Sequence, residues 1–151
     1  LGYYYVRDML GDALFTKALH HYIQQWHSKH PMPYDFFNCI NAGSGQNLNW
    51  FWKRWFFDNG SPDLAITRVT RQKGQYTILI TNTGTKPVPI NLTLYLADGS
   101  TQLVHESVAA WKNDNKTFTI THITPKRIKK MVLGTTYDPD VNKENNGWEA
   151  K

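Results

Sequence analysis

An abrupt change in composition near Pro62 constrains the fold more than any other feature. Fifteen of the 21 aromatic residues lie before position 61, whereas 14 of the 15 threonines follow it. Aromatic residues mixed with Ala, Leu and Gln suit helices, and Thr and Val at alternating positions suit β-strands. We therefore predict an α+β chain: a helical segment over residues 1–62, a β domain over residues 63–137 and a polar C-terminal tail over residues 138–151.

The first half shows apolar stripes with the three- and four-residue spacing of helices. One helix is expected to stop at Gly11, and Asp12 is expected to cap the next by accepting bonds from free backbone N–H groups. A short helix should cover residues 33–42. The last helix should start at Ser44 or Gly45, with Ser44 as its N-cap. Because its apolar residues lie nearly all round, we expect that helix to be buried between layers.

The second half shows strict alternation of apolar and polar residues. Asp98-Gly99 is a hairpin turn, because both central residues of a type I′ turn need a positive φ. About seven short strands with turns every eight to twelve residues indicate a β-sandwich of immunoglobulin or fibronectin type III shape. The clearest strands are expected at residues 64–70, 76–80, 88–96, 101–107, 117–123 and 127–133.

The charge pattern argues against two classes of partner. The net charge is +5 and the pI is about 9.3, but only Lys126, Arg127, Lys129 and Lys130 form a basic cluster. Nucleic-acid-binding domains usually show a denser basic face with a recognisable motif, so we expect a solvated basic surface and no nucleic acid. No apolar run approaches the ~18 residues of a membrane span. The chain carries no targeting signal, which leaves its compartment open.

Four histidines crowd the second helix, at positions 20, 21, 27 and 30. A metal site would need a carboxylate or a third histidine arranged with a pair of them. The first glutamate of the whole chain is Glu106, so the helical half holds no His-Glu-x-x-His motif and no Glu general base. We therefore expect these histidines to be exposed or to pack.

No nucleophile stands in a catalytic pattern either. Cys39 lies among apolar residues, where a buried inert thiol is the usual outcome. Ser44 lacks the strand and the Gly-x-Ser-x-Gly spacing of a nucleophile elbow. We predict that this chain contains no catalytic, cofactor-binding or metal-ligating residue.

The stretch from Val6 to Phe15 resembles the Leu-Arg-x-x-x-Gly-x-x-x-Phe element of the aminopeptidase N-like zinc metallopeptidases, the gluzincins. An ordered series of further similarities follows, ending with a closing segment like that of bacterial members: Tyr22, Trp26, and residues 29–31, 35–37, 44–52, 55–57, 63–66, 140–142 and 145–146. The resemblance implies the late helices of a thermolysin-like catalytic domain, followed by a fibronectin type III-like β-sandwich.

The same resemblance implies what this chain lacks. The family's zinc motif, its distant Glu and its Gly-x-Met-x-Asn strand are absent, and the family's catalytic tyrosine does not align with Tyr3, Tyr4 or Tyr5. The implied protein is the C-terminal part of a zinc-dependent aminopeptidase, inactive alone. Zinc is expected in the full-length parent and no cofactor in this chain. Its partners would be the missing N-terminal and catalytic portions, with a peptide substrate for the parent, where zinc-bound water attacks the scissile carbonyl.

An interpretation from another class is a noncatalytic glycan- or protein-binding β-sandwich module with a helical extension. In that case Trp50, Trp52 and Trp111 would be the exposed platforms. Because a helical unit separated from a larger domain exposes apolar surface, self-association of the isolated chain is also expected.

Overall fold

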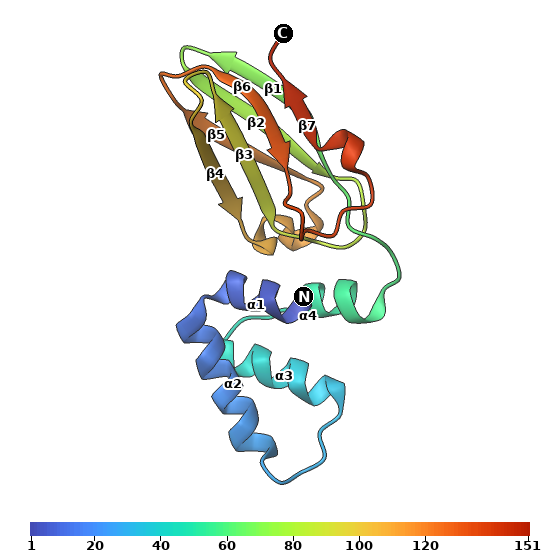
Figure 1. Ribbon diagram of the computed structural model, residues 1–151. Coiled ribbons are helices and arrows are strands. Elements are labelled where there is room, and N and C mark those ends of the chain that lie inside the picture. The colour runs from blue at the N-terminus through green and yellow to red at the C-terminus, as the bar shows by residue number, and fades with distance from the viewer. The chain divides into compact units, whose positions relative to one another are not determined.

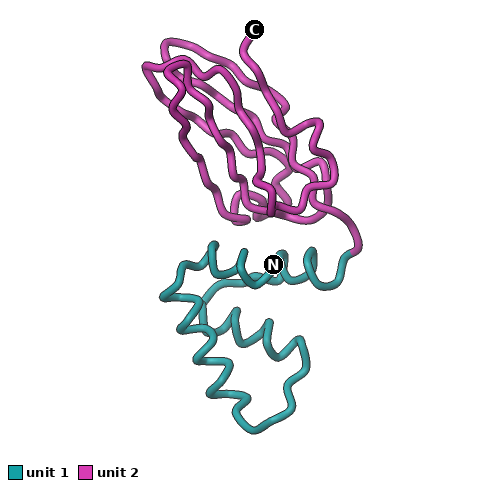
Figure 2. The backbone as a smooth tube through the Cα atoms, in the orientation of Figure 1, with its two compact units in different colours: residues 1–58 teal, residues 59–151 magenta.

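The computed structural model describes residues 1–151 and divides into two compact units, Leu1–Asp58 and Asn59–Lys151 (Figure 2). The first unit is helical, and the second consists of two antiparallel sheets (Figure 1). The predicted α+β class, with a helical segment followed by a β-sandwich, is confirmed. No helix combines the length and the apolar character that crossing a membrane requires.

The helical unit contains α1 (Gly2–Leu10), α2 (Asp12–Trp26), α3 (Pro33–Ser44), α4 (Asn49–Trp52) and the π-helical turn η1 (Lys53–Phe57). Gly11 separates α1 from α2 with a φ of 81°, a left-handed value that glycine adopts without strain. The expected capping role of Asp12 was wrong. Asp12 is the first residue of α2, and its Oδ1 lies 2.6 Å from Nε of Arg7 instead.

The boundary between α3 and α4 also differs from the prediction. The helix α3 continues to Ser44 and closes on Gly45 in the left-handed conformation, and α4 begins only at Asn49. Ser44 Oγ donates to the carbonyl oxygen of Asn41 (3.2 Å) and accepts from the N–H of Gln46 (3.3 Å). Ser44 therefore closes α3, and its predicted role as the N-cap of the last helix was wrong.

Aromatic rings fill the core of the helical unit. The rings of Phe37 and Trp52 stack with their centroids 4.6 Å apart, and Phe51 is fully buried beside them. The last helix was expected to be buried on all sides, but Phe56 and Phe57 of η1 are 41% and 48% exposed. Those two side chains leave an aromatic face of η1 open to solvent.

The helices α2 and α3 approach closely at Gly43. A Cβ atom at this position would lie 2.8 Å from Cα of Ala18 and 2.9 Å from Cβ of His21. Separations below about 3 Å do not occur between real side-chain atoms, so any side chain here must push the two helices apart.

The substitution Gly43→Val is expected to lower the free energy of unfolding of the helical unit by about 2 kcal/mol, because overpacking forces the backbones apart. The neighbouring Ala42 is exposed on the same helix. Ala42→Val therefore carries only the weaker helix propensity of valine, which costs about 0.5 kcal/mol. Urea unfolding followed by tryptophan fluorescence compares the two variants. Equal losses of stability would contradict the close approach of α2 and α3.

The sandwich is built from two antiparallel sheets. One has the order β1-β2-β5, from β1 (Leu64–Gln72), β2 (Gln75–Asn82) and β5 (Thr117–Ile123). The other has the order β4-β3-β6-β7, from β4 (Thr101–Glu106), β3 (Ile90–Leu96), β6 (Ile128–Leu133) and β7 (Gly147–Glu149). Alternate residues of β2 and β3 are buried, which is the period of a strand with one face on the core.

Two buried hydrogen bonds support the sandwich core. The hydroxyl of Tyr76 on β2 accepts from the N–H of Ile128 on β6 (3.0 Å), which ties one sheet to the other. Nε1 of Trp111, in the 3₁₀ segment η2 (Val108–Asp114), donates to the carbonyl oxygen of Val88 (2.8 Å). The apolar side chains that are completely shielded from solvent are Ile78, Ile80, Ile90, Leu92, Leu94, Val108, Ile128 and Met131.

The C-terminal segment, residues 138–151, is tied to the sandwich and is not a free polar tail. It contains the 3₁₀ turn η3 (Lys143–Asn145) and the strand β7, which pairs with β6. Oδ2 of Asp140 accepts from the N–H of Leu64 (3.0 Å), and Nδ2 of Asn145 donates to Oδ1 of Asp63 (2.9 Å). Polar composition here reflects side chains that hold turns together, since Asp and Asn accept bonds from nearby backbone N–H groups.

Candidate functional site

The basic cluster predicted from the sequence lies on the outer surface of the four-stranded sheet. Tyr95 on β3 pairs with Lys130, and the next residue, Leu96, pairs with Ile128, so Lys129 has no partner on β3. Such a β-bulge interrupts the usual alternation of faces. Both Lys129 and Lys130 are consequently exposed, although they are neighbours in a strand.

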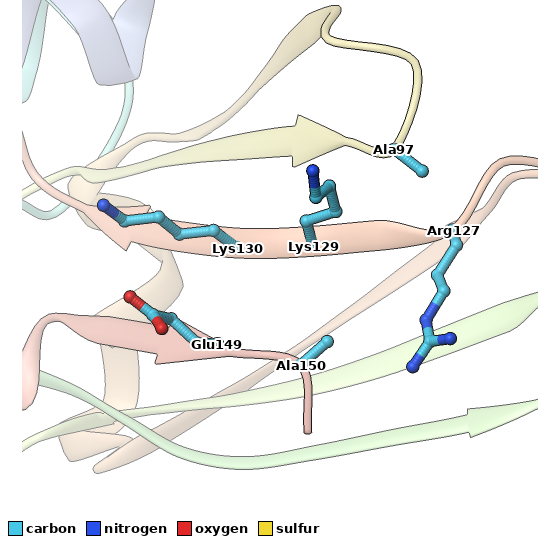
Figure 3. A pocket seen from close by; sticks show the side chains of 6 residues that line it. All are labelled: Ala97, Arg127, Lys129, Lys130, Glu149 and Ala150. Atoms are coloured by element: carbon cyan, nitrogen blue, oxygen red, sulfur yellow. The ribbon is translucent and has the colours of Figure 1, made fainter.

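Together with neighbouring segments, these lysines line an open cleft of about 570 Å³. Its remaining lining residues are Ala97, Arg127, Glu149 and Ala150. Figure 3 shows Lys130 extending along β6, Glu149 rising from β7, and Arg127 pointing in the opposite direction from Lys129. The Nζ atom of Lys130 lies 5.8 Å from the ring centroid of Tyr95, within cation–π distance. Three cations against one carboxylate make this a surface for anions.

Lys126, the fourth cation of the cluster, is already paired. Its Nζ lies 2.6 Å from Oδ2 of Asp98 in the β3–β4 turn. The hydrogen bond from Lys126, followed by those from the hydroxyl and N–H of Ser100, holds the pKa of Asp98 well below its ordinary value. Lys126 thus stabilises the turn beside the cleft and adds no free charge to it.

The substitution Lys126→Met is expected to raise the pKa of Asp98, because it removes the largest cause of the depression. The pKa stays below that of a free aspartate, since both bonds from Ser100 remain. A pKa lower in the folded state stabilises the fold above the unfolded-state pKa, and this contribution is lost as the pH falls through the folded-state pKa. NMR titration of the Asp98 carboxyl carbon measures the shift. Lys129→Met is the control, and an equal shift in that variant would contradict the pairing.

The histidines singled out from the sequence do not converge on one point. His20 and His21 border a polar groove between α2 and α3, and His27 and His30 lie beyond the end of α2. Nowhere in residues 1–151 do three His, Cys, Asp or Glu side chains come together as a metal-binding group. That the chain carries no catalytic, cofactor-binding or metal-ligating residue stays a prediction.

The other candidate residues are mostly interior. Cys39 is buried on α3 with its thiol unpaired. Trp52 and Trp111 are 2% and 3% exposed, so neither offers a ring face to a glycan, and Trp50 is half-buried. Among the tryptophans named as platforms, none is fully exposed.

Sequence reasoning missed the contribution of β7 to the cleft. The three residues of this strand, from Gly147 to Glu149, are too few to show alternation, and a polar run precedes them. The bulge at Lys129 was equally invisible, because adjacent strand residues are expected on opposite faces. A single tryptophan, Trp148, within a polar segment was the one available signal of a buried contact.

Two comparisons with known proteins place the chain. No family model matches it. Over 113 residues it is 26% identical to aminopeptidase N of Haemophilus influenzae, an alignment that covers 68% of this chain and 13% of that protein. The crystal structure of Legionella pneumophila aminopeptidase A in complex with aspartic acid matches with a TM-score of 0.63 and 19% identity, over 87% of this chain and 15% of that one. The chain is aminopeptidase-related.

The structural match includes parts of both units of this aminopeptidase-related chain, because 87% of its residues exceeds the length of either unit. The order of a helical segment and a β-sandwich is therefore shared with the Legionella protein. This aminopeptidase-related chain spans only 13% and 15% of the lengths of the two proteins it matches.

Proposed function

We propose that the chain is the C-terminal part of a zinc-dependent aminopeptidase of the gluzincin type and has no peptidase activity by itself. The sequence likeness to aminopeptidase N carries this proposal. In that role residues 1–62 complete the helical layer of the catalytic domain, residues 63–137 form a fibronectin type III-like sandwich attached to it, and residues 138–151 form a polar segment tied to that sandwich.

The residues of this chain do not fit a catalytic zinc ion. Such a site takes three protein ligands and an activating carboxylate, and no group of three possible ligands assembles here. The helical unit contains no glutamate, since the first is Glu106. In the proposed parent, zinc and the general base belong to other parts of the polypeptide, which would also bind the peptide substrate.

The open aromatic face of the helical unit fits the same proposal. Tyr34, Phe56 and Phe57 are 62%, 41% and 48% exposed. Phe57 stacks on Tyr34 with the ring centroids 5.2 Å apart, and both phenylalanines contact the ring of Phe37. Large apolar side chains grouped at a surface are typical of a buried interface that lacks its partner. We propose that the rest of the catalytic domain covers these side chains in the parent and that the isolated chain self-associates through them.

The test compares the 151-residue chain with the natural polypeptide that contains it. Both are purified without metal-affinity steps and supplied with zinc. Elemental analysis then gives the zinc content, and aminoacyl anilides report hydrolysis. The natural polypeptide is expected to hold one zinc per chain and to hydrolyse the anilides, while the 151-residue chain does neither. Stoichiometric zinc in the short chain, or an inactive and zinc-free natural polypeptide, would overturn the proposal.

A further inference from the structure

We propose that the open side of the sandwich between β1 and β7 binds an acidic peptide segment in an extended conformation. The segment would pair with the free edge of β7 and place its carboxylates on Arg71 and Arg127. This inference goes beyond the proposed peptidase role and does not depend on it, since every residue involved belongs to the β-sandwich unit.

The free edge of β7 follows from its hydrogen bonds. Leu133 N–H donates to the carbonyl oxygen of Asn146 (2.7 Å), and Ala150 N–H donates to that of Lys129 (2.9 Å). Antiparallel strands alternate between residues that bond to their neighbour and residues that do not. The N–H and C=O groups of Gly147 and Glu149 therefore point away from β6, and β7 is the last strand of its sheet. A Cβ atom on Gly147 would meet nothing within 4 Å.

The space beside this edge is lined by two arginines, one on a strand of the three-stranded sheet and one just before a strand of the four-stranded sheet. Arg71 on β1 and Arg127 before β6 border a pocket of about 160 Å³, together with Tyr76 and Trp148. The Arg71 guanidinium has no carboxylate partner and lies 5.3 Å from the ring centroid of Tyr76. Nη2 of Arg127 donates to a main-chain oxygen of Lys151 (3.2 Å), the last residue of the sequence.

The positive charge continues on both sides of the pocket. Arg127 also lines the cleft of Figure 3, with Lys129 and Lys130, while Arg71 also lines a cleft beside Lys73 at the β1–β2 turn. These three clefts share lining residues, and the charged side chains that line them are six cations and one carboxylate: Arg71, Lys73, Arg127, Lys129, Lys130, Lys151 and Glu149. Like charges this close together repel one another and create a positive potential, which an anion bound among them would relieve.

The chemistry of the surface favours a peptide over other anions. A guanidinium forms two parallel hydrogen bonds to one carboxylate, which suits glutamate or aspartate side chains. The edge groups of Gly147 and Glu149 match the alternating N–H and C=O groups of an extended backbone. Nucleic acid offers phosphates but no such backbone. Because β7 has only three residues, charge should supply most of the affinity and the edge should set the orientation.

The test uses fluorescence anisotropy with the full chain and a labelled peptide of alternating Glu and Val. The double variant Arg71→Gln/Arg127→Gln is expected to bind at least about tenfold more weakly than the wild type, since two charge-assisted contacts are lost. The control Lys112→Gln/Lys116→Gln removes the same charge from exposed positions outside the three clefts and should bind as the wild type does. Thermal unfolding verifies that each variant is folded. Should the arginine variant unfold, Lys129→Gln/Lys130→Gln replaces it with the same expectation.

Two further probes separate the sources of binding. The same peptide with alternate backbone nitrogens methylated should bind more weakly, because it cannot pair with β7. A single-stranded thymidine oligonucleotide of equal charge should bind more weakly than the peptide. Equal loss in the arginine and control variants, unchanged binding of the methylated peptide, or tighter binding of the oligonucleotide would each overturn the proposal.

Discussion

Replacing Asn41 by alanine is expected to lower the free energy of unfolding of the helical unit by about 3 kcal/mol. Oδ1 of Asn41 accepts from the N–H of Leu48 (3.1 Å) and from Nε1 of Trp52 (3.0 Å), and Nδ2 donates to Oδ1 of Asn49 (2.8 Å). Leu48 and Trp52 are each 2% exposed. Alanine leaves both donors without a partner and out of reach of water. A buried donor that loses its only acceptor costs its full desolvation free energy, which is more than the net value of a typical hydrogen bond.

Asn38 provides a matched control on the same helix. It is exposed, and its replacement by alanine removes an equal number of atoms. Denaturant titration followed by tryptophan fluorescence reports mainly on the helical unit, which holds four of the six tryptophans. Asn41→Ala should shift the transition strongly and Asn38→Ala hardly at all. Similar shifts in the two variants would show that Asn41 does not hold α3 to α4.

Replacing Trp111 by alanine is expected to cost the sandwich about 3–5 kcal/mol. The indole is 3% exposed, so its removal leaves a large cavity under η2. The carbonyl oxygen of Val88 also loses its donor. Trp111→Phe keeps much of the volume but not the N–H, and should cost about 1–3 kcal/mol.

The two variants of Trp111 separate the contribution of the indole volume from that of its hydrogen bond. Far-UV circular dichroism during urea unfolding, and amide hydrogen exchange in β2 and β3, give the stability of the sandwich. Alanine should lower the protection of these amides more than phenylalanine does. If phenylalanine matched the wild type, the bond to Val88 would contribute nothing, and if alanine matched phenylalanine, the indole would not fill the core.

The strands were predictable because a strand with one buried face requires apolar residues at every second position of the sequence. The alternating run 88–96 contains β3, and a turn at Asp98-Gly99 joins it to β4. The predicted type I′ geometry was wrong, because only Gly99 has a positive φ (86°) and Asp98 does not. Helix ends were less predictable, because their determinants are tertiary. The start of α4 depends on the side chain of Asn41, seven residues away from the Leu48 N–H that it binds.

The cleft was only partly predictable for the same reason. Sequence adjacency revealed Lys129 and Lys130 but not their shared face, which requires the bulge against Tyr95 and Leu96. Arg71 joins Arg127 through contact between two sheets, across more than 50 positions of the chain. No periodic pattern in the sequence predicts that these two arginines lie close together.

The single cysteine allows the opening rate of the helical unit to be measured separately from that of the sandwich. Cys39 lies on the buried side of α3 and is 9% exposed, and the sandwich has no thiol at all. A thiol reagent can reach it only when the helical unit opens, so the labelling rate measures that opening alone. Followed in the presence and absence of the rest of a peptidase, the same rate would report how strongly assembly closes the helices.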